Sequence, residues 1–166
     1  REHDLPYLGI CLGMQIAVIA FARSVAGMAD ANSGEFDPQS THKVIDFLPD
    51  QNEEVAKGGT LRLGAYPCKV VPGTQMYRCY GKTDISERHR HRYEFNNDFR
   101  ARLIDAGLVV SGTSPDDYIV ETVEIPGNDF YIGVQFHPEF KSRPNRAHPL
   151  FLGLVGAALR HEEKNK

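Results

Sequence analysis

The order of apolar and polar positions near the start of the chain predicts a strand followed at once by a helix. Tyr7 to Ile10 form a short apolar run that is typical of a buried strand. From about Leu12 to Ala26 apolar residues occupy most faces of a predicted helix, and Gly27 is a suitable residue to cap its carboxyl end. Cys11 therefore stands on the turn between the two elements.

The next stretch alternates turn formers with one short apolar segment. Residues 30–38 (DANSGEFDP) are rich in turn formers and predict an ordered loop. A short strand is predicted from Lys43 to Phe47, followed by a polar, glycine-ended segment from Gln51 to Gly59 that we expect to be a mobile loop.

The remainder of the chain is mostly strand-like and ends in a helix. "NNDFRARLIDAG" has an Asn/Asp start and a closing Gly107, which predict a short capped helix. "HPLFLGLVGAALRHEE" predicts a closing amphipathic helix, so helices surround a strand-rich middle and a mixed α/β sheet is expected. The predicted strands are TLRLGAYPCKVV, ERHRHRYEFN, LVVSGTSP, YIVETVEIP and FYIGVQF, the last two joined by a turn at residues 126–128.

Composition narrows the class of protein. A length of 166 residues fits one domain, and 25% charged with 41% hydrophobic residues is ordinary for a globular chain. The net charge of −3 argues against binding nucleic acid or an anionic membrane surface. No apolar run reaches the roughly 20 residues that a membrane-spanning helix needs. The three cysteines have no C-x-x-C spacing, which argues against a disulfide framework or a zinc site and favours a reducing cytoplasm.

The chain begins at Arg1, and Cys11 follows almost at once. A parallel sheet with a single strand before its nucleophile would be unusual. We therefore expect about half a domain of further sequence upstream of Arg1.

The first candidate for chemistry is Gly9-Ile10-Cys11-Leu12-Gly13, which matches the G-x-nucleophile-x-G turn with cysteine as the nucleophile. Glycine allows the tight turn, and the amino end of the following helix favours thiolate over thiol. The Leu12 N–H is placed to donate one oxyanion-hole hydrogen bond. The alternative is a buried core cysteine beside packing glycines.

The second candidate is the end of "YIGVQFHPEF", where His137 follows an apolar strand and Pro138 stops strand pairing. A histidine at a strand end can act as the base for a thiol, and Glu139 can fix its tautomer. Taken alone, His137 could equally be a surface histidine beside a glutamate. With Cys11 it suggests a Cys-His-Glu triad.

The third candidate is "ERHRHRYEFN", in which an extended backbone would place three arginines on one face and two histidines on the other. Nucleic-acid binding is disfavoured by the negative net charge. A solvated or salt-bridged strand remains open. So does an arginine that binds a carboxylate substrate in a bidentate manner.

Together these segments resemble the class I glutamine amidotransferases, and within them the glutaminase domains of the CTP synthase family. The segments PYLGICLGMQ, GGTLRLGAYPC, ERHRHRYEFN and QFHPEFKSRP…HPLF match that pattern in order across nearly the whole chain. The resemblance implies a glutamine amidotransferase domain over residues 1–166. Its α/β fold would be flavodoxin-like, with a mixed, largely parallel sheet flanked by helices, without its N-terminal strands in this chain.

The resemblance also implies roles for individual residues. Cys11 would attack the side-chain amide of glutamine, with His137 as acid and base and Glu139 as its orienting group. Glutamine would be bound by the residues Gly9, Gln15, Glu35 and Arg92, of which Glu35 would hold the α-amino group and Arg92 the α-carboxylate. Taken without the family, the last three are more simply explained as an ordinary helix glutamine, a loop glutamate and a salt-bridged arginine.

The resemblance further implies partners and cofactors outside this domain. Ammonia would pass to an N-terminal synthetase domain of the same polypeptide, where ATP and Mg²⁺ activate UTP for amination to CTP. GTP would be the allosteric activator of glutamine hydrolysis, and the whole enzyme would be a cytoplasmic homotetramer. No metal or cofactor is expected in the glutaminase domain. Three alternatives stay open: a glutaminase serving another synthetase, an inactive regulatory module, and a cysteine hydrolase acting on other amides.

Overall fold

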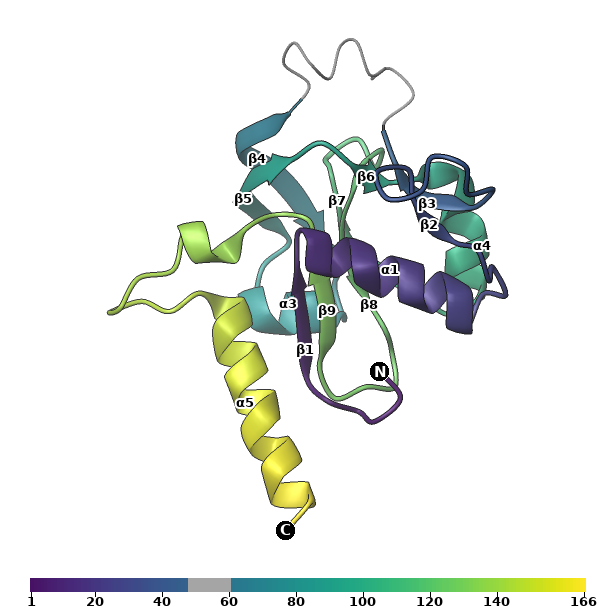
Figure 1. Ribbon diagram of the computed structural model, residues 1–166. Coiled ribbons are helices and arrows are strands. Elements are labelled where there is room, and N and C mark those ends of the chain that lie inside the picture. The colour runs from purple at the N-terminus through teal and green to yellow at the C-terminus, as the bar shows by residue number, and fades with distance from the viewer. Residues whose placement is uncertain (48–60) are drawn as a thin grey trace.

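The computed structural model describes residues 1–47 and 61–166, and a six-stranded sheet forms its centre (Figure 1). The predicted mobile loop from Gln51 to Gly59 lies outside the described residues. The order of the strands across the sheet is β1-β9-β8-β7-β4-β5. Their bounds in this order are Tyr7–Ile10, Tyr131–Val134, Val120–Glu124, Val109–Thr113, Arg62–Val70 and Asp84–His91.

The sheet is mixed and flanked by helices, as predicted, but fewer of its strands are parallel than expected. Among the described strands of this sheet, β1 and β9 are parallel and every other neighbouring pair is antiparallel. The reason is connection length: β7, β8 and β9 follow one another through short turns, whereas parallel neighbours need a long crossover. One such crossover, nearly the whole chain, separates β1 from β9.

A small second sheet lies at one end of the main sheet (Figure 1). It contains β2 (Asn32–Ser33), β3 (Lys43–Asp46) and β6 (Glu94–Phe95), in that order. β2 falls in the predicted loop of residues 30–38, so that stretch is ordered as expected but contributes a strand. The predicted capped helix divides into a short 3-10 helix, Asn97–Phe99, and α4, Arg100–Asp105.

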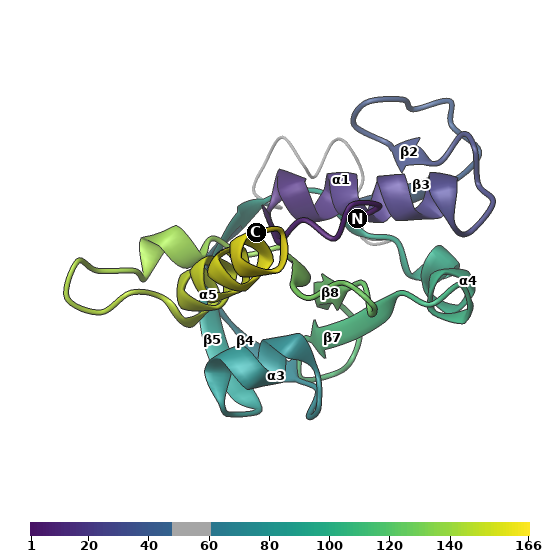
Figure 2. The ribbon, with the colours of Figure 1, turned by 90° about the horizontal axis from the view of Figure 1, so that it is seen from below.

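The longer helices lie on both faces of the main sheet. Seen from below, α1 (Leu12–Ser24) and α3 (Gln75–Tyr80) lie on opposite sides of β7 and β8 (Figure 2). The closing helix α5 (Pro149–Lys164) packs against α3 and β1. α1 ends two residues earlier than predicted because the N–H groups of Val25 and Ala26 both bond to Phe21 O, which closes the last turn.

Two hydrophobic clusters fill the two sides of the sheet. One joins α1 to the small sheet and α4, and it includes Met14, Val18 and Phe95. The other joins α3 and α5 to the opposite face and includes Met76, Phe136 and Leu150. Alternate residues of β9 enter different clusters, since Tyr131 packs in the first and Ile132 in the second. β9 is therefore held from both faces, which gives the residues that follow it a rigid support.

Within the described residues, no helix combines the length and apolar character that crossing a membrane would require.

Candidate active site

Cys11 lies on a strained turn between β1 and α1. Its backbone has φ 52° and ψ −105°, a conformation that residues with a side chain rarely adopt, and it forms the N-cap of α1. The turn is possible because residue 9 is glycine: a Cβ there would lie 2.7 Å from the Gly13 carbonyl carbon and 2.7 Å from a Tyr7 ring carbon. The predicted tight turn between strand and helix at Cys11 is therefore present.

His137 and Glu139 form the pair predicted from the H-P-E segment. The Nδ1 atom of His137 lies 2.6 Å from Oε1 of Glu139. A carboxylate only accepts hydrogen bonds, so it holds the proton on Nδ1 and leaves the lone pair on Nε2. That Nε2 atom is buried and has no hydrogen-bond partner within the described part of the chain. His137 also stacks on Phe140, with ring centroids 4.9 Å apart, which limits rotation of the imidazole.

Cys11 and His137 follow the same edge of the sheet because β1 and β9 run parallel and in register. Ile10 pairs with Val134, and the Cys11 N–H donates to Val134 O at 2.8 Å. Groups that follow the carboxyl ends of neighbouring parallel strands meet at one edge of the sheet. The Cys11 side chain and the loop carrying His137 therefore share that edge.

The outer strand β5 closes the same site from the other side. β1 and β5 stand at opposite ends of the strand order, yet Cys11 Sγ lies 4.0 Å from Arg90 O of β5. The backbone N–H of His137 donates to the backbone carbonyl of Arg88 at 2.8 Å. The sheet therefore curls until its last strand reaches the end of its first. Arg88, Arg90 and Arg92 are exposed, whereas His89 and His91 between them are buried, which confirms the predicted alternation.

The electrostatic setting of Cys11 differs from the expectation of a favoured thiolate. Burial of the half-buried side chain is the largest influence and raises the pKa of the Cys11 thiol. Hydrogen bonds from the Leu12 N–H and the Gln135 side chain lower this pKa, while the charges of Glu139 and Glu94 raise it further. The helix end does stabilise the sulfur, but desolvation outweighs it.

A cavity of about 340 Å³ opens beside Cys11 and collects most of the predicted substrate residues. Glu35 comes from the loop after β2, and Arg92 follows β5. Neither side chain has a polar partner among the residues that the structure describes. The cavity is lined by Cys11, Leu12, Gln15, Glu35, Phe36, Leu61, Arg90, His91, Arg92 and Tyr93.

Two predicted glutamine-binding residues are placed differently from expectation. Gly9 is buried against Gly13 and does not line this cavity, so its contribution is to permit the turn. Gln15 does line the cavity, but its Nε2 atom donates to Tyr93 O at 3.1 Å and to Gln135 Oε1 at 3.2 Å. In this state the Gln15 amide is directed into the protein.

Sequence reasoning missed a buried charged cluster behind the cavity. Arg62 donates to both oxygens of Glu121, at 2.7 and 3.2 Å, and to Glu94 at 3.4 Å. His91 lies 3.3 Å from Glu94, and His89 lies 2.9 Å from His91. The alternating pattern of "ERHRHRYE" predicted which side chains share a face. It could not show that the histidine face is covered by β4 and β8, because that depends on pairing with distant strands.

Burial sets the protonation of this cluster. Desolvation raises the pKa of Glu94 to about 8, because the attraction of Arg62 only partly offsets the loss of solvent. Desolvation likewise lowers the pKa of His91 to about 3 and that of His89 to about 2, and the positive charge of Arg62 acts in the same direction. At neutral pH the two histidines and Glu94 are therefore mainly uncharged.

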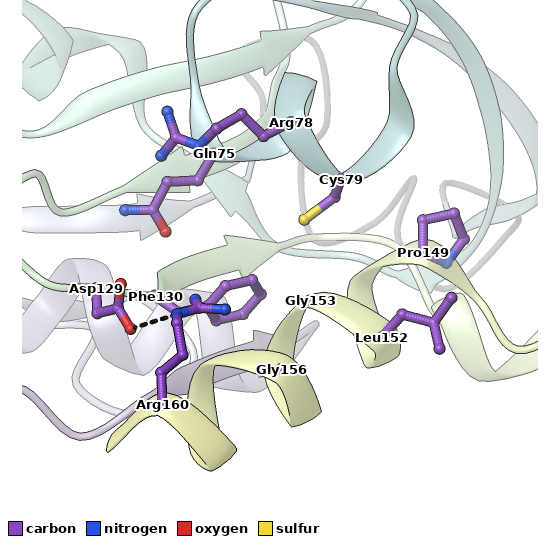
Figure 3. A pocket seen from close by; sticks show the side chains of 10 residues that line it. All are labelled: Gln75, Arg78, Cys79, Asp129, Phe130, Pro149, Leu152, Gly153, Gly156 and Arg160. Atoms are coloured by element: carbon purple, nitrogen blue, oxygen red, sulfur yellow. Dashed lines mark hydrogen bonds and ion pairs between the residues drawn. The ribbon is translucent and has the colours of Figure 1, made fainter. Parts of the chain in front are cut away.

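A larger cavity of about 460 Å³ lies between α3 and α5, away from the predicted site residues (Figure 3). Cys79 faces Gly153 across it, and burial raises the pKa of the Cys79 thiol to about 11. Arg160 donates to Asp129 at 3.2 Å at its other end. Among the described residues that line this cavity, no histidine or carboxylate is paired with Cys79, so they offer no activated nucleophile. Within residues 1–47 and 61–166 no group of three or more ligating side chains could hold a metal ion.

A cysteine on a strand-to-helix turn, at the same edge of the sheet as a histidine held by a carboxylate, is suited to acyl transfer through a thioester. Cysteine-dependent attack on an amide or ester carbonyl is the class of chemistry that this geometry defines. A family model described as glutamine amidotransferase class-I matches residues 1–157, and the chain belongs to that family.

Individual proteins in this family are similar to the chain over nearly its whole length. It is 59% identical over 160 residues to a CTP synthase of Moorella thermoacetica and 60% identical over 160 residues to one of Carboxydothermus hydrogenoformans. Both matches cover 96% of this chain, which spans 30% of the length of those relatives. A solved glutaminase domain of Trypanosoma brucei CTPS with bound acivicin is 40% identical, with a TM-score of 0.88 over 95% of this chain and 61% of that one.

Proposed function

We propose that this chain is the glutaminase domain of a CTP synthase and that it hydrolyses L-glutamine to glutamate and ammonia. The observation that carries the proposal is the cavity in which Cys11 lies with the carboxylate of Glu35 and the guanidinium of Arg92, neither of which has a polar side-chain partner among the described residues. A free amino acid carries an ammonium and a carboxylate, and these two side chains complement it. The similarity to CTP synthases supports glutamine as the substrate and CTP synthesis as the setting.

In the first half-reaction Cys11 Sγ attacks the side-chain amide carbon of glutamine. The thiol proton passes to Nε2 of His137, which Glu139 keeps free to accept it. The developing oxyanion is stabilised by the Leu12 N–H at the amino end of α1. The C–N bond then breaks, His137 returns the proton to the leaving nitrogen, and ammonia departs from a γ-glutamyl thioester on Cys11.

In the second half-reaction water attacks the thioester carbon. His137 takes one proton from the water, the C–S bond breaks, and the sulfur leaves as the thiolate, which His137 reprotonates. Glutamate is released and Cys11 is restored. Glu139 stabilises the imidazolium in both halves, because its carboxylate lies against Nδ1 at 2.6 Å.

Recognition of the substrate backbone falls to residues from separate segments. Glu35 pairs with the α-ammonium, and the guanidinium of Arg92 forms a bidentate contact with the α-carboxylate. Arg90 lines the same cavity and adds positive potential. Gln15 borders the bound ligand while its amide nitrogen stays hydrogen-bonded to Tyr93 O and Gln135 Oε1.

The CTP synthases similar to this chain are about three times as long as it is, so the activity of a whole enzyme is a further part of the proposal. Ammonia passes to an N-terminal synthetase domain in the same polypeptide, where ATP with Mg²⁺ phosphorylates O4 of UTP. Ammonia displaces that phosphate to give CTP, and GTP activates glutamine hydrolysis. The enzyme acts as a homotetramer in the cytoplasm, with no nucleic-acid or membrane partner.

The first test is labelling with an electrophilic glutamine analogue, read by intact mass in the protein at its natural length. One adduct is expected on wild type and none on Cys11→Ala. Cys79→Ala is the matched control, because it removes a half-buried thiol without a base and should keep the adduct. Excess glutamine should block labelling, and excess glutamate should block it far less.

An adduct on Cys68 or Cys79, or no adduct at all, would overturn glutamine as the substrate. Labelling at Cys11 together with glutamine-dependent CTP formation from UTP and ATP supports the full proposal. Labelling and ammonia release without CTP formation would retain the glutaminase and remove the CTP synthase assignment.

A further inference from the structure

Gln135 touches the reactive sulfur, although the sequence motifs assign it no role. It lies between the end of β9 and His137, and its side chain is fully buried. Its Nε2 atom is 3.6 Å from Cys11 Sγ, and its Oε1 atom is 3.2 Å from Nε2 of Gln15. The Gln15 Nε2 atom is also 3.1 Å from Tyr93 O.

The direction of these hydrogen bonds follows from the backbone. The carbonyl of Tyr93 can only accept, so the Gln15 amide must present its nitrogen there. That same nitrogen carries a second hydrogen, which it donates to the Gln135 oxygen. With its oxygen occupied, Gln135 has only its NH₂ group left to face the sulfur. A backbone carbonyl thus fixes, through two side-chain amides, a donor aimed at Cys11.

We propose that Gln135 is a further active-site residue, whose amide N–H donates to Cys11 Sγ and stabilises the thiolate that forms as His137 takes the thiol proton. This inference rests on the proposed function only in naming glutamine as the molecule attacked. A neutral thiol is a weak acceptor and a thiolate is a strong one, so a fixed donor favours the ionised form. The donor cannot turn away without leaving two buried amides unpaired.

The backbone of Gln135 supports the same assignment. Its N–H donates to Glu121 O at 2.9 Å, which ties the residue to β8 just beyond the last regular pair of β9. This backbone hydrogen bond holds the Gln135 side chain next to the turn that carries Cys11. A glutamine that merely filled core space would be replaceable by an apolar side chain of similar length, and this difference makes the proposal testable.

The experiment measures the pKa of Cys11 from the rate of alkylation by iodoacetamide between pH 6 and pH 10. Adducts are located by peptide mass so that Cys68 and Cys79 do not contribute. The variants Gln135→Met, Gln135→Glu and Gln15→Met are compared with wild type in the protein at its natural length. Other groups acting on the thiol stay in place: His137, Glu139, Glu94, His91, Arg90, Arg92 and Glu35.

Gln135→Met keeps the length of the side chain and removes the donor. We expect the pKa of Cys11 to rise by roughly one unit, the size of one charge-assisted hydrogen bond. Alkylation at pH 7 should slow only about threefold, because a thiolate of higher pKa is intrinsically more nucleophilic. Gln135→Glu should raise the pKa further, since it places a carboxylate oxygen beside the sulfur. Gln15→Met should raise it less, because the donor remains but can turn.

The matched control is Gln75→Glu. Gln75 is also buried, and its side-chain amide donates to Asn128 O and accepts from the backbone N–H of Tyr131. It is the first residue of α3 and lies away from Cys11. This variant should lower the thermal midpoint and leave the pKa of Cys11 unchanged. An equal pKa in wild type, Gln135→Met and Gln135→Glu would overturn the proposal, as would an equal shift in Gln75→Glu.

The two proposals fail in different ways. If the wild type releases no ammonia from glutamine but the Gln135 variants shift the pKa of Cys11, the proposed substrate is wrong and the role of Gln135 stands. If glutamine is hydrolysed and the pKa does not move, the role of Gln135 is wrong and the proposed function stands.

Discussion

Two histidine–glutamate pairs lie close together in this molecule and differ mainly in their contact with solvent. In the first, His137 Nδ1 and Glu139 Oε1 are 2.6 Å apart, and the side chains are 19% and 45% exposed. In the second, His91 Nδ1 and Glu94 Oε1 are 3.3 Å apart, and the side chains are 3% and 2% exposed. The same two residue types therefore occupy opposite electrostatic environments.

Burial decides whether such a histidine–glutamate pair can take part in chemistry. The exposed pair can hold a carboxylate beside an imidazolium, because water reaches Glu139. In the buried pair, desolvation favours the uncharged form of both partners, and the pKa values move apart to about 8 for Glu94 and about 3 for His91. A pair that stays neutral cannot stabilise a proton arriving from Cys11.

Competition for a single cation explains why Glu94 is the neutral carboxyl. Arg62 makes a two-point contact with Glu121 and a single, longer contact with Glu94. One guanidinium offsets the charge of one carboxylate, so the better-paired carboxylate, Glu121, keeps its negative charge. The cluster thus holds β4, β6 and β8 together with little net charge, directly behind the cavity beside Cys11.

The largest difference between the two pairs is expected when the imidazole of the His137–Glu139 pair is removed. His137→Gln should lower kcat for glutamine hydrolysis by about 10⁴-fold, since His137 is the base that the proposed mechanism assigns to Cys11. The thermal midpoint should stay close to wild type, because within residues 1–47 and 61–166 the side chain of His137 hydrogen-bonds only to Glu139. Steady-state kinetics and a thermal melt measure both. A retained kcat would show that His137 is not the base.

The next largest effect is expected from the second region and should appear in stability. Arg62→Met leaves Glu121 buried without its cation, and breaking a buried pair in this way typically costs about 3–5 kcal/mol. Denaturant unfolding at neutral pH measures the loss. Arg160→Met is a matched control, because its partner Asp129 lies at the surface and the pair is half exposed. Equal losses in the two variants would contradict a special role for the buried pair.

Exchanging each carboxyl for an amide compares the two pairs directly. Glu139→Gln should lower kcat about 10²-fold or more, because the charge that stabilises the imidazolium is lost, while KM changes little. Glu94→Gln replaces a mainly neutral carboxyl by another neutral group, so kcat should remain within about threefold of wild type. Kinetics of both variants at one pH provide the measurement, and similar losses in kcat would show that the pairs act together.

The smallest effect concerns the pH dependence of stability. The pKa of Glu94 is raised in the folded state to about 8 from 4.5, so between these values the folded chain keeps a proton that the unfolded chain releases. Stability must therefore fall as pH rises through this window. His89 and His91 act oppositely as pH falls toward and below the ordinary histidine pKa of 6.5, where the unfolded chain gains protons that the folded one excludes.

Between pH 6.5 and pH 8 the contribution of Glu94 should lower stability by up to about 2 kcal/mol, and the difference between wild type and Glu94→Gln separates it from the remaining histidine contribution. Glu94→Gln should flatten this decline. Urea unfolding at several pH values measures it. A wild-type profile that rises over the same range would mean that Glu94 is ionised in the folded protein.

The parts of the site that the sequence predicted are those encoded within short segments. The turn at Cys11 needs only a strand, two glycines and a helix in succession, and His137 with Glu139 needs only a strand end followed by proline. The alternation of Arg88 and His89 follows from the two-residue period of a strand. Each of these features depends on neighbours in sequence, so local physical rules suffice.

The features that were missed depend on contacts between distant segments. Gln135 acquires its role from Gln15 and Cys11, more than a hundred residues away. The antiparallel neighbours of β4 and the covering of the histidine face are likewise products of the assembled sheet.

The helix α3 is different: its Thr74 cap and left-handed Gly81 are present in the sequence, but a six-residue helix carries too little periodicity to be recognised.

The backbone at Cys11 has a consequence for how this chain can change over time. A positive φ at a residue with a side chain stores roughly 1–3 kcal/mol, which glycine at the same position would release. Selection for stability alone would thus favour replacing the nucleophile. The cysteine is maintained against the preference of the fold, so a copy freed from its catalytic duty would become more robust by losing its reactive residue.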